Sequence, residues 1–96
     1  SAARRPVALI PLGAAADARA QVLAQDLRKA GYAVELGYSG NMKRRLNRAN
    51  KAGAAAAVII GDDELAKDVA TVRDMDSGEQ SEKPVAALVE SLALYR

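Results

Sequence analysis

Five basic residues fall within a stretch of nine positions that no acidic residue interrupts: Lys43, Arg44, Arg45, Arg48 and Lys51. The wider segment 36–61 holds no Asp or Glu, so no neighbour in sequence neutralises these charges. Arg44, Arg48 and Lys51 recur at i, i+4 and i+7, which places them on one ridge of a helix, where the two arginines repel slightly. Such a ridge suits the phosphates of a nucleic acid. The alternative is a helix face that is merely solvated.

A second group of charged residues follows the next apolar run, where Asp62, Asp63 and Glu64 come directly after a glycine. Adjacent carboxylates can bind Mg²⁺, but such sites need ligands from several elements; otherwise Asp62 or Asp63 caps a helical turn. Glu64 and the later Arg73 are more informative, because together they offer an acceptor and a donor fork to base edges. If segment 68–75 lies beside the preceding strand, we expect Glu64 and Arg73 to share the loop edge of the sheet and to read bases in a single-stranded RNA loop.

The composition excludes most catalytic chemistry. The sequence has no Cys and no His, which removes disulfides, Cys/His zinc sites, thiol nucleophiles and histidine general bases. Segment 11–17 joins a strand to a helix, but with one glycine and no lysine it is neither a dinucleotide fingerprint nor a P-loop. We therefore predict a binding domain without catalytic or metal-binding residues. A small-ligand binder that uses the crevice beyond the first and third strands would need the phosphate loop that is missing.

The size of the chain predicts one domain, because 96 residues cannot supply two hydrophobic cores. Aromatic residues make up only 3% of the sequence, so alanine and the aliphatic residues must fill that core. We expect residues 1–5 to be a leader and residues 6–96 to be the domain, and the start at Ser1 suggests a piece of a longer protein. No apolar run is long enough to span a membrane, so we expect no membrane partner and a cytoplasmic location.

The hydrophobic pattern predicts eight elements that position these residues. Strands are expected over 7–10, 33–38, 54–60, 68–75 and 79–83, and helices over 14–30, 42–52 and from Pro84 onward. Two strand–helix–strand units with right-handed crossovers give parallel strands in the order 2-1-3. Segment 62–67 is too short for a crossover helix, so the fourth strand returns antiparallel and a hairpin leads to the fifth. The prediction is an α/β fold: a mixed five-stranded sheet of order 2-1-3-4-5, its first three strands parallel, with three helices.

Several of these segments match the motifs of a known family. They read VALIPLG at 7–13, LAQDLR at 23–28, SGNMKRRLNRANKAGA at 39–54, VIIGDDELA at 58–66 and VATVRDMDSGEQ at 69–80. Over residues 5–96 the chain resembles the C-terminal anticodon-binding domain of class IIa aminoacyl-tRNA synthetases, most closely that of the histidyl branch. The Ser-Gly before the basic helix and the Ser-Gly-Glu-Gln after the fourth strand carry the likeness to this branch. The fold of the family, a five-stranded mixed sheet with three helices, agrees with the fold expected from the residues.

The resemblance implies an RNA-binding role for the residues singled out above. The family domain binds the anticodon stem and loop of its tRNA. Glu64 and Arg73 match positions that contact anticodon bases in related members, and the basic helix over 43–51 matches the one that approaches the RNA backbone. Ser39 departs from an asparagine that some relatives carry just after the second strand.

The resemblance also implies a longer parent chain. A histidyl parent is a homodimer whose separate N-terminal catalytic domain activates histidine with ATP and Mg²⁺ and transfers it to tRNA(His). The anticodon stem-loop of tRNA(His) and this catalytic domain are therefore the expected partners, and no cofactor is expected in the 96 residues themselves. The alternative is a synthetase-like paralogue whose domain serves regulation or protein interaction.

Overall fold

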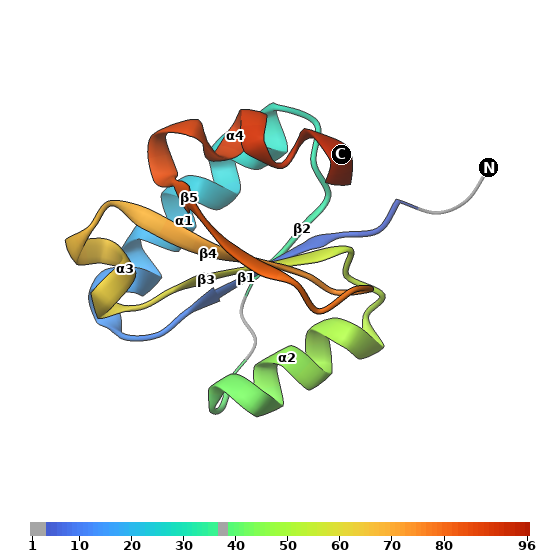
Figure 1. Ribbon diagram of the computed structural model, residues 1–96, viewed down its shortest axis with the longest axis horizontal. Helices are drawn as coiled ribbons and strands as arrows, with labels where there is room; N and C mark the ends of the chain where they lie inside the picture. Colours follow the sequence, from blue (N-terminus) through green and yellow to red (C-terminus); the bar gives the residue numbers. More distant parts are fainter. Residues whose placement is uncertain (1–3, 37–38) are drawn as a thin grey trace.

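The computed structural model describes residues 4–36 and 39–96, which form five strands and four α-helices (Figure 1). The strands are β1 (Val7–Pro11), β2 (Val34–Glu35), β3 (Ala56–Ile60), β4 (Val69–Asp74) and β5 (Gln80–Pro84). The helices are α1 (Ala14–Lys29), α2 (Met42–Lys51), α3 (Asp62–Ala66) and α4 (Leu88–Ser91), and short 3₁₀ turns at Val85–Ala87 and Ala93–Tyr95 flank α4. Within this described part of the chain, no helix is long and apolar enough to cross a membrane.

The five strands form one mixed sheet in the order β2-β1-β3-β4-β5, which confirms the predicted order. β1 runs parallel to β2 and β3, whereas β4 runs antiparallel to β3 and β5 runs antiparallel to β4. In this register Ala57 of β3 stands opposite Arg73 of β4, and Arg73 stands opposite Gln80 of β5. The three residues therefore form a row across the antiparallel half of the sheet.

Helices cover both faces of the sheet. α1 and the C-terminal segment with α4 lie on one face, and α2 lies on the other (Figure 1). β3 shows the division, because Val58 and Ile60 pack in the core formed with α1, while Ala57 and Ile59 pack against α2. A strand that is buried on both faces needs apolar residues at every position, which explains why 54–60 is a continuous apolar run.

The segment after β3 differs from the prediction, because Asp62–Ala66 forms the short helix α3. The structure therefore has four α-helices where three were predicted. The expectation that Asp62 or Asp63 caps this turn was wrong: the N-cap is Gly61, and Asp62 and Asp63 lie in the first turn. The side chain of Glu64 turns back and its Oε1 accepts a hydrogen bond of 2.7 Å from the Gly61 N–H. Acidic residues in a first turn also interact favourably with the helix dipole.

The boundaries of two further elements differ from the prediction. Pro84 was predicted to begin the last helix, but it ends β5 opposite Val69. The chain stays extended there because the Val85 N–H donates to the Asp68 carbonyl oxygen at 3.0 Å, and the helix that follows covers only Leu88–Ser91. The predicted strand 33–38 is described as Val34–Glu35, and its residues 37 and 38 lie outside the described residues.

Candidate nucleic-acid interface

α2 has a well-defined beginning and a buried side. The side chain of Asn41 caps it, with Oδ1 accepting a hydrogen bond of 2.9 Å from the Arg44 N–H. Ala49 is fully buried, and Met42 and Leu46 pack against the apolar residues of β1 and β3. The prediction that these three residues dock the helix on the sheet is therefore confirmed. The opposite side of α2 is left to face solvent.

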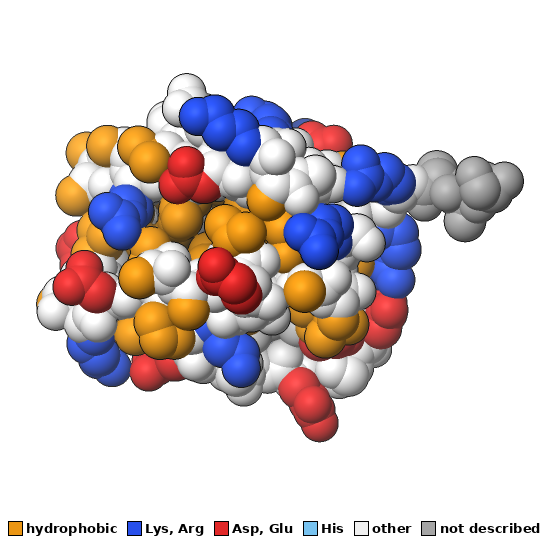
Figure 2. Space-filling model, turned by 90° about the horizontal axis from the view of Figure 1, so that it is seen from above, with side chains coloured by type: hydrophobic (Ala, Val, Ile, Leu, Met, Phe, Trp, Pro, Cys, Tyr) orange, Lys and Arg blue, Asp and Glu red, His pale blue; other side chains and the backbone are white. Residues whose placement is uncertain are grey.

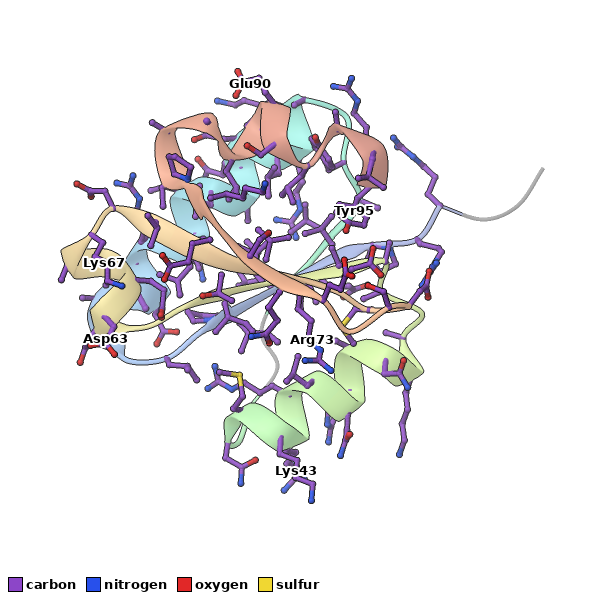
Figure 3. All side chains as sticks on the ribbon, viewed as in Figure 1. Lys43, Asp63, Lys67, Arg73, Glu90 and Tyr95 are labelled. Carbon is purple, nitrogen blue, oxygen red and sulfur yellow. The ribbon has the colours of Figure 1, made fainter. Side chains whose placement is uncertain are left out.

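That solvent side carries an uncompensated positive charge. Its exposed basic residues, here called the α2 ridge, are Lys43, Arg44, Arg48 and Lys51. Among the described residues, none of the four has a carboxylate within 4.0 Å; the two ion pairs there join Arg5 to Asp76 and Lys67 to Glu82. Figure 3 shows Lys43 extending away from the sheet. Exposed cations without partners produce the positive surface potential that attracts polyanions.

Arg45 behaves differently from the α2 ridge. It is half-buried, and its guanidinium donates from Nε to the Gly40 carbonyl oxygen at 2.8 Å and from Nη1 to the Pro11 carbonyl oxygen. These bonds tie the beginning of α2 to the end of β1. Arg45 was predicted from the sequence to contact phosphates together with the other basic residues of this helix. Spacing along a helix does not reveal which side chains reach back to the sheet.

The segment before α2 is shaped by a glycine. Gly40 has φ of +101°, and a Cβ placed there would stand 2.7 Å from Cδ of Arg44. A side chain at this position would therefore be strained and would displace Arg44. The Ser-Gly pair thus lets the α2 ridge begin immediately after the helix cap.

Arg73 lies on the face of the sheet that α2 covers. Its neighbours Ala70 and Val72 point into the core beneath α1, so Thr71 and Arg73 point to the other face; Figure 3 shows Arg73 on this side. Gln80 and Glu82 stand opposite them on β5 and share this face. Arg73 is half-buried, Gln80 is exposed, and Arg73 Nη1 donates to Gln80 Oε1 at 3.2 Å.

Glu64 does not share an edge of the sheet with Arg73, so the predicted meeting of the two at the loop edge was wrong. Glu64 follows the carboxyl end of β3, whereas Arg73 stands opposite Ala57, three residues before that end. Because strands rise about 3.3 Å per residue, Ala57 lies roughly 10 Å from the end of β3, and Glu64 lies beyond that end. The physical reason is that β4 is antiparallel, so by residue 73 the chain has travelled back along β3.

The acidic turn and the first strand–helix loop give no sign of a second site. Among the described residues, no three carboxylates converge on a point where a metal ion could bind. Gly13 forms the N-cap of α1 without a side-chain cap, and Asp62 Oδ1 lies 3.8 Å from the place where a Cβ at Gly13 would stand. A carboxylate beside this helix N-terminus disfavours anions there.

The hairpin that follows Arg73 is held by contacts that the sequence did not predict. Asp74 Oδ1 accepts from the N–H groups of Asp76 and Ser77 at 2.9 and 2.8 Å, and its Oδ2 accepts from the Tyr95 hydroxyl at 2.8 Å. The bond from the Ser77 N–H is the main cause that lowers the pKa of Asp74. Burial, followed by the bond to Asp74, raises the pKa of Tyr95 to about 12. The turn-forming Asp-Ser-Gly was a visible signal for this hairpin, but nothing local pointed to Tyr95.

The face opposite α2 has a different character. Figure 2, which looks onto α1 and the C-terminal segment, shows acidic, basic and hydrophobic side chains interspersed. The charged residues of α2, in contrast, are all basic. The side of the molecule with α2 and the row Arg73–Gln80 is therefore the candidate interface for a polyanion.

Comparison with known proteins identifies the family of this chain. The family model described as "Anticodon binding domain" matches residues 6–93. The chain belongs to this family. The histidine–tRNA ligase of Gluconacetobacter diazotrophicus is 48% identical over 92 residues, which cover 96% of this chain and 22% of that protein. The ligase of Rhodospirillum rubrum is 46% identical over 93 residues, which cover 97% of this chain and 22% of that protein.

Solved structures give the same result for this anticodon-binding domain. Apo histidyl-tRNA synthetase from S. aureus superposes with a TM-score of 0.84 at 29% identity over 92% of this chain and 23% of its own. The synthetase from Nostoc sp. PCC 7120 superposes with a TM-score of 0.87 at 28% identity over 96% of this chain and 22% of its own. The predicted family and fold class are confirmed. The chain spans 22% of the length of the two curated relatives described above.

Proposed function

We propose that this chain binds the anticodon stem-loop of tRNA(His), as the C-terminal domain of a histidine–tRNA ligase. The observation that carries the proposal is the α2 ridge: four exposed cations without carboxylate partners among the described residues, on the same side as the Arg73–Gln80 row. The family match and the names of the relatives supply the kind of RNA.

In this proposal the α2 ridge contacts the RNA backbone and the sheet contacts the bases. Lysine and arginine bound to phosphates position an RNA without reading its sequence. Arg73 offers donors to base edges, and Glu64 retains a second carboxylate oxygen beyond the one that accepts from Gly61. Their separation along β3, with Glu64 beyond the end of the strand and Arg73 opposite Ala57, suits an anticodon loop whose splayed bases reach different parts of the surface.

The remaining steps are assigned to the rest of the proposed parent protein. Activation of histidine with ATP and Mg²⁺ would take place in a separate catalytic domain, because the described residues offer neither a phosphate-binding loop nor converging carboxylates. A homodimeric parent and a cytoplasmic location belong to the same proposal. None of the observations on this chain favours the alternative of a regulatory paralogue.

Nuclear magnetic resonance tests this assignment residue by residue. An anticodon stem-loop of tRNA(His) is added to the isotope-labelled chain and backbone amide shifts are followed. We expect the largest changes in α2, around Arg73 and Gln80, and at the beginning of α3. Changes confined to α1 and the C-terminal segment would show that the RNA binds the opposite face and would refute the proposal.

A further inference from the structure

Gln80 is the cross-strand neighbour of Arg73 and touches its guanidinium. The two residues stand opposite each other in the β4–β5 ladder, and Arg73 Nη1 donates to Gln80 Oε1 at 3.2 Å. Both lie on the face that α2 covers, and Gln80 is exposed. Among the described residues, the amide NH₂ of Gln80 donates no hydrogen bond, while its carbonyl oxygen accepts from Arg73.

Both terminal nitrogens of the Arg73 guanidinium lie near residues of the hairpin. Nη1 bonds to the Gln80 carbonyl oxygen, and Nη2 lies 3.6 Å from the place where a Cβ at position 78 would stand. Gly78 has φ of +79°, so glycine suits both the turn and the space that the guanidinium occupies. Both contacts of this long side chain are therefore with the hairpin.

The contact between Gln80 and Arg73 is chemically suited to an arginine that recognises bases. Arginine recognises base edges through a planar fork of donors, so the orientation of the plane decides which bases it can serve. A carboxylate partner would orient the guanidinium but would neutralise its charge. A neutral amide carbonyl orients the group and leaves the positive charge available to RNA.

Backbone hydrogen bonds fix the shape of the hairpin and therefore the position of Gln80. Asp74 and Glu79 are joined by a hydrogen bond from the Asp74 N–H to the Glu79 carbonyl oxygen at 2.9 Å, and the Gly78 N–H donates to the Asp74 carbonyl oxygen at 2.8 Å. The Asp74 carboxylate caps the same turn through the Ser77 N–H. These bonds hold Gly78 and Gln80, which both lie near the Arg73 guanidinium, in one hairpin.

We propose that Gln80 is a positioning residue that holds the Arg73 guanidinium in the orientation that discriminates anticodon bases. The proposal rests on the proposed function, in which Arg73 contacts a base. It deepens that function by assigning part of the specificity to a residue that acts through Arg73. Gln80 is therefore expected to affect the choice between RNAs more than the affinity for RNA in general.

The test compares binding of a stem-loop with the tRNA(His) anticodon to binding of stem-loops with single changes in the anticodon. Q80M keeps the size of the side chain and removes the acceptor; we expect the ratio of affinities to fall about threefold. Q80E keeps an acceptor and adds a negative charge, so all RNAs should bind more weakly by one common factor with the ratio retained. Ser81→Ala, next in the strand but on the other face, is the control and should leave the ratio unchanged. Equal ratios for Q80M and the unaltered chain would overturn the proposal.

A double-mutant cycle with Arg73→Ala separates positioning from direct contact. If Gln80 acts through Arg73, Q80M should have no further effect on the ratio once Arg73 is removed. An equal threefold loss in both backgrounds would show that Gln80 contacts the RNA itself and would overturn the positioning role. If Arg73→Ala leaves the ratio unchanged, the proposed base contact fails, and the positioning role fails with it. If Arg73→Ala lowers the ratio but Q80M does not change it, the positioning role is overturned and the base contact of Arg73 stands.

Discussion

Arg5 and Asp76 stand 71 positions apart in the sequence, yet their side chains form two hydrogen bonds of 2.8 and 3.0 Å. Arg5 also donates to the carbonyl oxygens of Gly53 and Ala54 at 2.9 and 3.0 Å. One arginine therefore joins the start of the described chain, the loop after α2 and the hairpin that follows Arg73. The predicted boundary after residue 5 stays a prediction, but Arg5 is part of the folded surface.

Replacing Arg5 should cost more stability than replacing its acidic partner. An ion pair this exposed contributes little by itself, whereas the two carbonyl oxygens lose their donor only when the arginine is removed. We expect Arg5→Ala to lower the urea midpoint of unfolding more than Asp76→Asn does. Equal midpoints for the two variants would mean that the carbonyl contacts contribute nothing.

The α2 ridge predicts the salt dependence of RNA binding. Removing two phosphate contacts with the pair Arg44→Ala and Arg48→Ala should reduce the slope of log affinity against log salt by about 0.7–0.9 for each contact. Arg45→Ala is the matched control on the same helix: because its guanidinium is held by two carbonyl oxygens, it should change the slope less and lower the unfolding free energy by about 1 kcal/mol. An unchanged slope in the double variant would remove the α2 ridge from the interface.

Glu64 can be tested for two roles separately. Glu64→Gln keeps an oxygen that accepts from the Gly61 N–H, so α3 should remain stable, while the loss of charge should weaken discrimination between anticodons. Glu64→Ala removes the cap and should also destabilise the domain by about 1 kcal/mol. Urea unfolding measures the stability of each variant. Binding of matched and altered stem-loops measures its discrimination between anticodons. Full discrimination in Glu64→Gln would leave Glu64 with a structural role only.

Tyr95 should make the domain sensitive to alkaline conditions. Its pKa is raised from 10.0 to about 12 in the folded chain, chiefly by burial and then by the bond to Asp74. The folded state thus favours the protonated phenol, so this stabilisation is complete below pH 10 and is lost as the pH rises toward 12. We expect the stability difference between the unaltered chain and Tyr95→Phe to shrink over that range when unfolding is measured at several pH values. A difference that does not vary with pH would contradict the assignment.

Much of the fold could be predicted because local patterns dictate it. The alternation of apolar strands and helices, with right-handed crossovers, predicted the order of the parallel strands, and the Asp-Ser-Gly turn predicted the hairpin. The missed features depend on contacts distant in sequence or on register. Pro84 ends a strand because Val85 bonds to Asp68, and Tyr95 reaches Asp74 across 21 positions.

The type of candidate site could be predicted from the sequence, but the spatial arrangement of its residues could not. The types and spacing of residues in α2 were sufficient to find the α2 ridge. The separation of Glu64 from Arg73 and the attachment of Arg45 to Pro11 and Gly40 are set by strand register and side-chain reach, which sequence spacing does not encode. Gln80 was visible only as part of a motif, and its contact with Arg73 comes from the pairing of β4 with β5.

The most direct test of the central claim is a binding titration of the 96-residue chain with the tRNA(His) anticodon stem-loop at two salt concentrations. A stem-loop with an altered anticodon is measured alongside. We predict binding that weakens steeply with salt and that favours the tRNA(His) anticodon at both concentrations. An affinity that does not change with salt concentration, or an equal affinity for the two stem-loops, would contradict an anticodon-reading surface formed by α2 and the Arg73–Gln80 row.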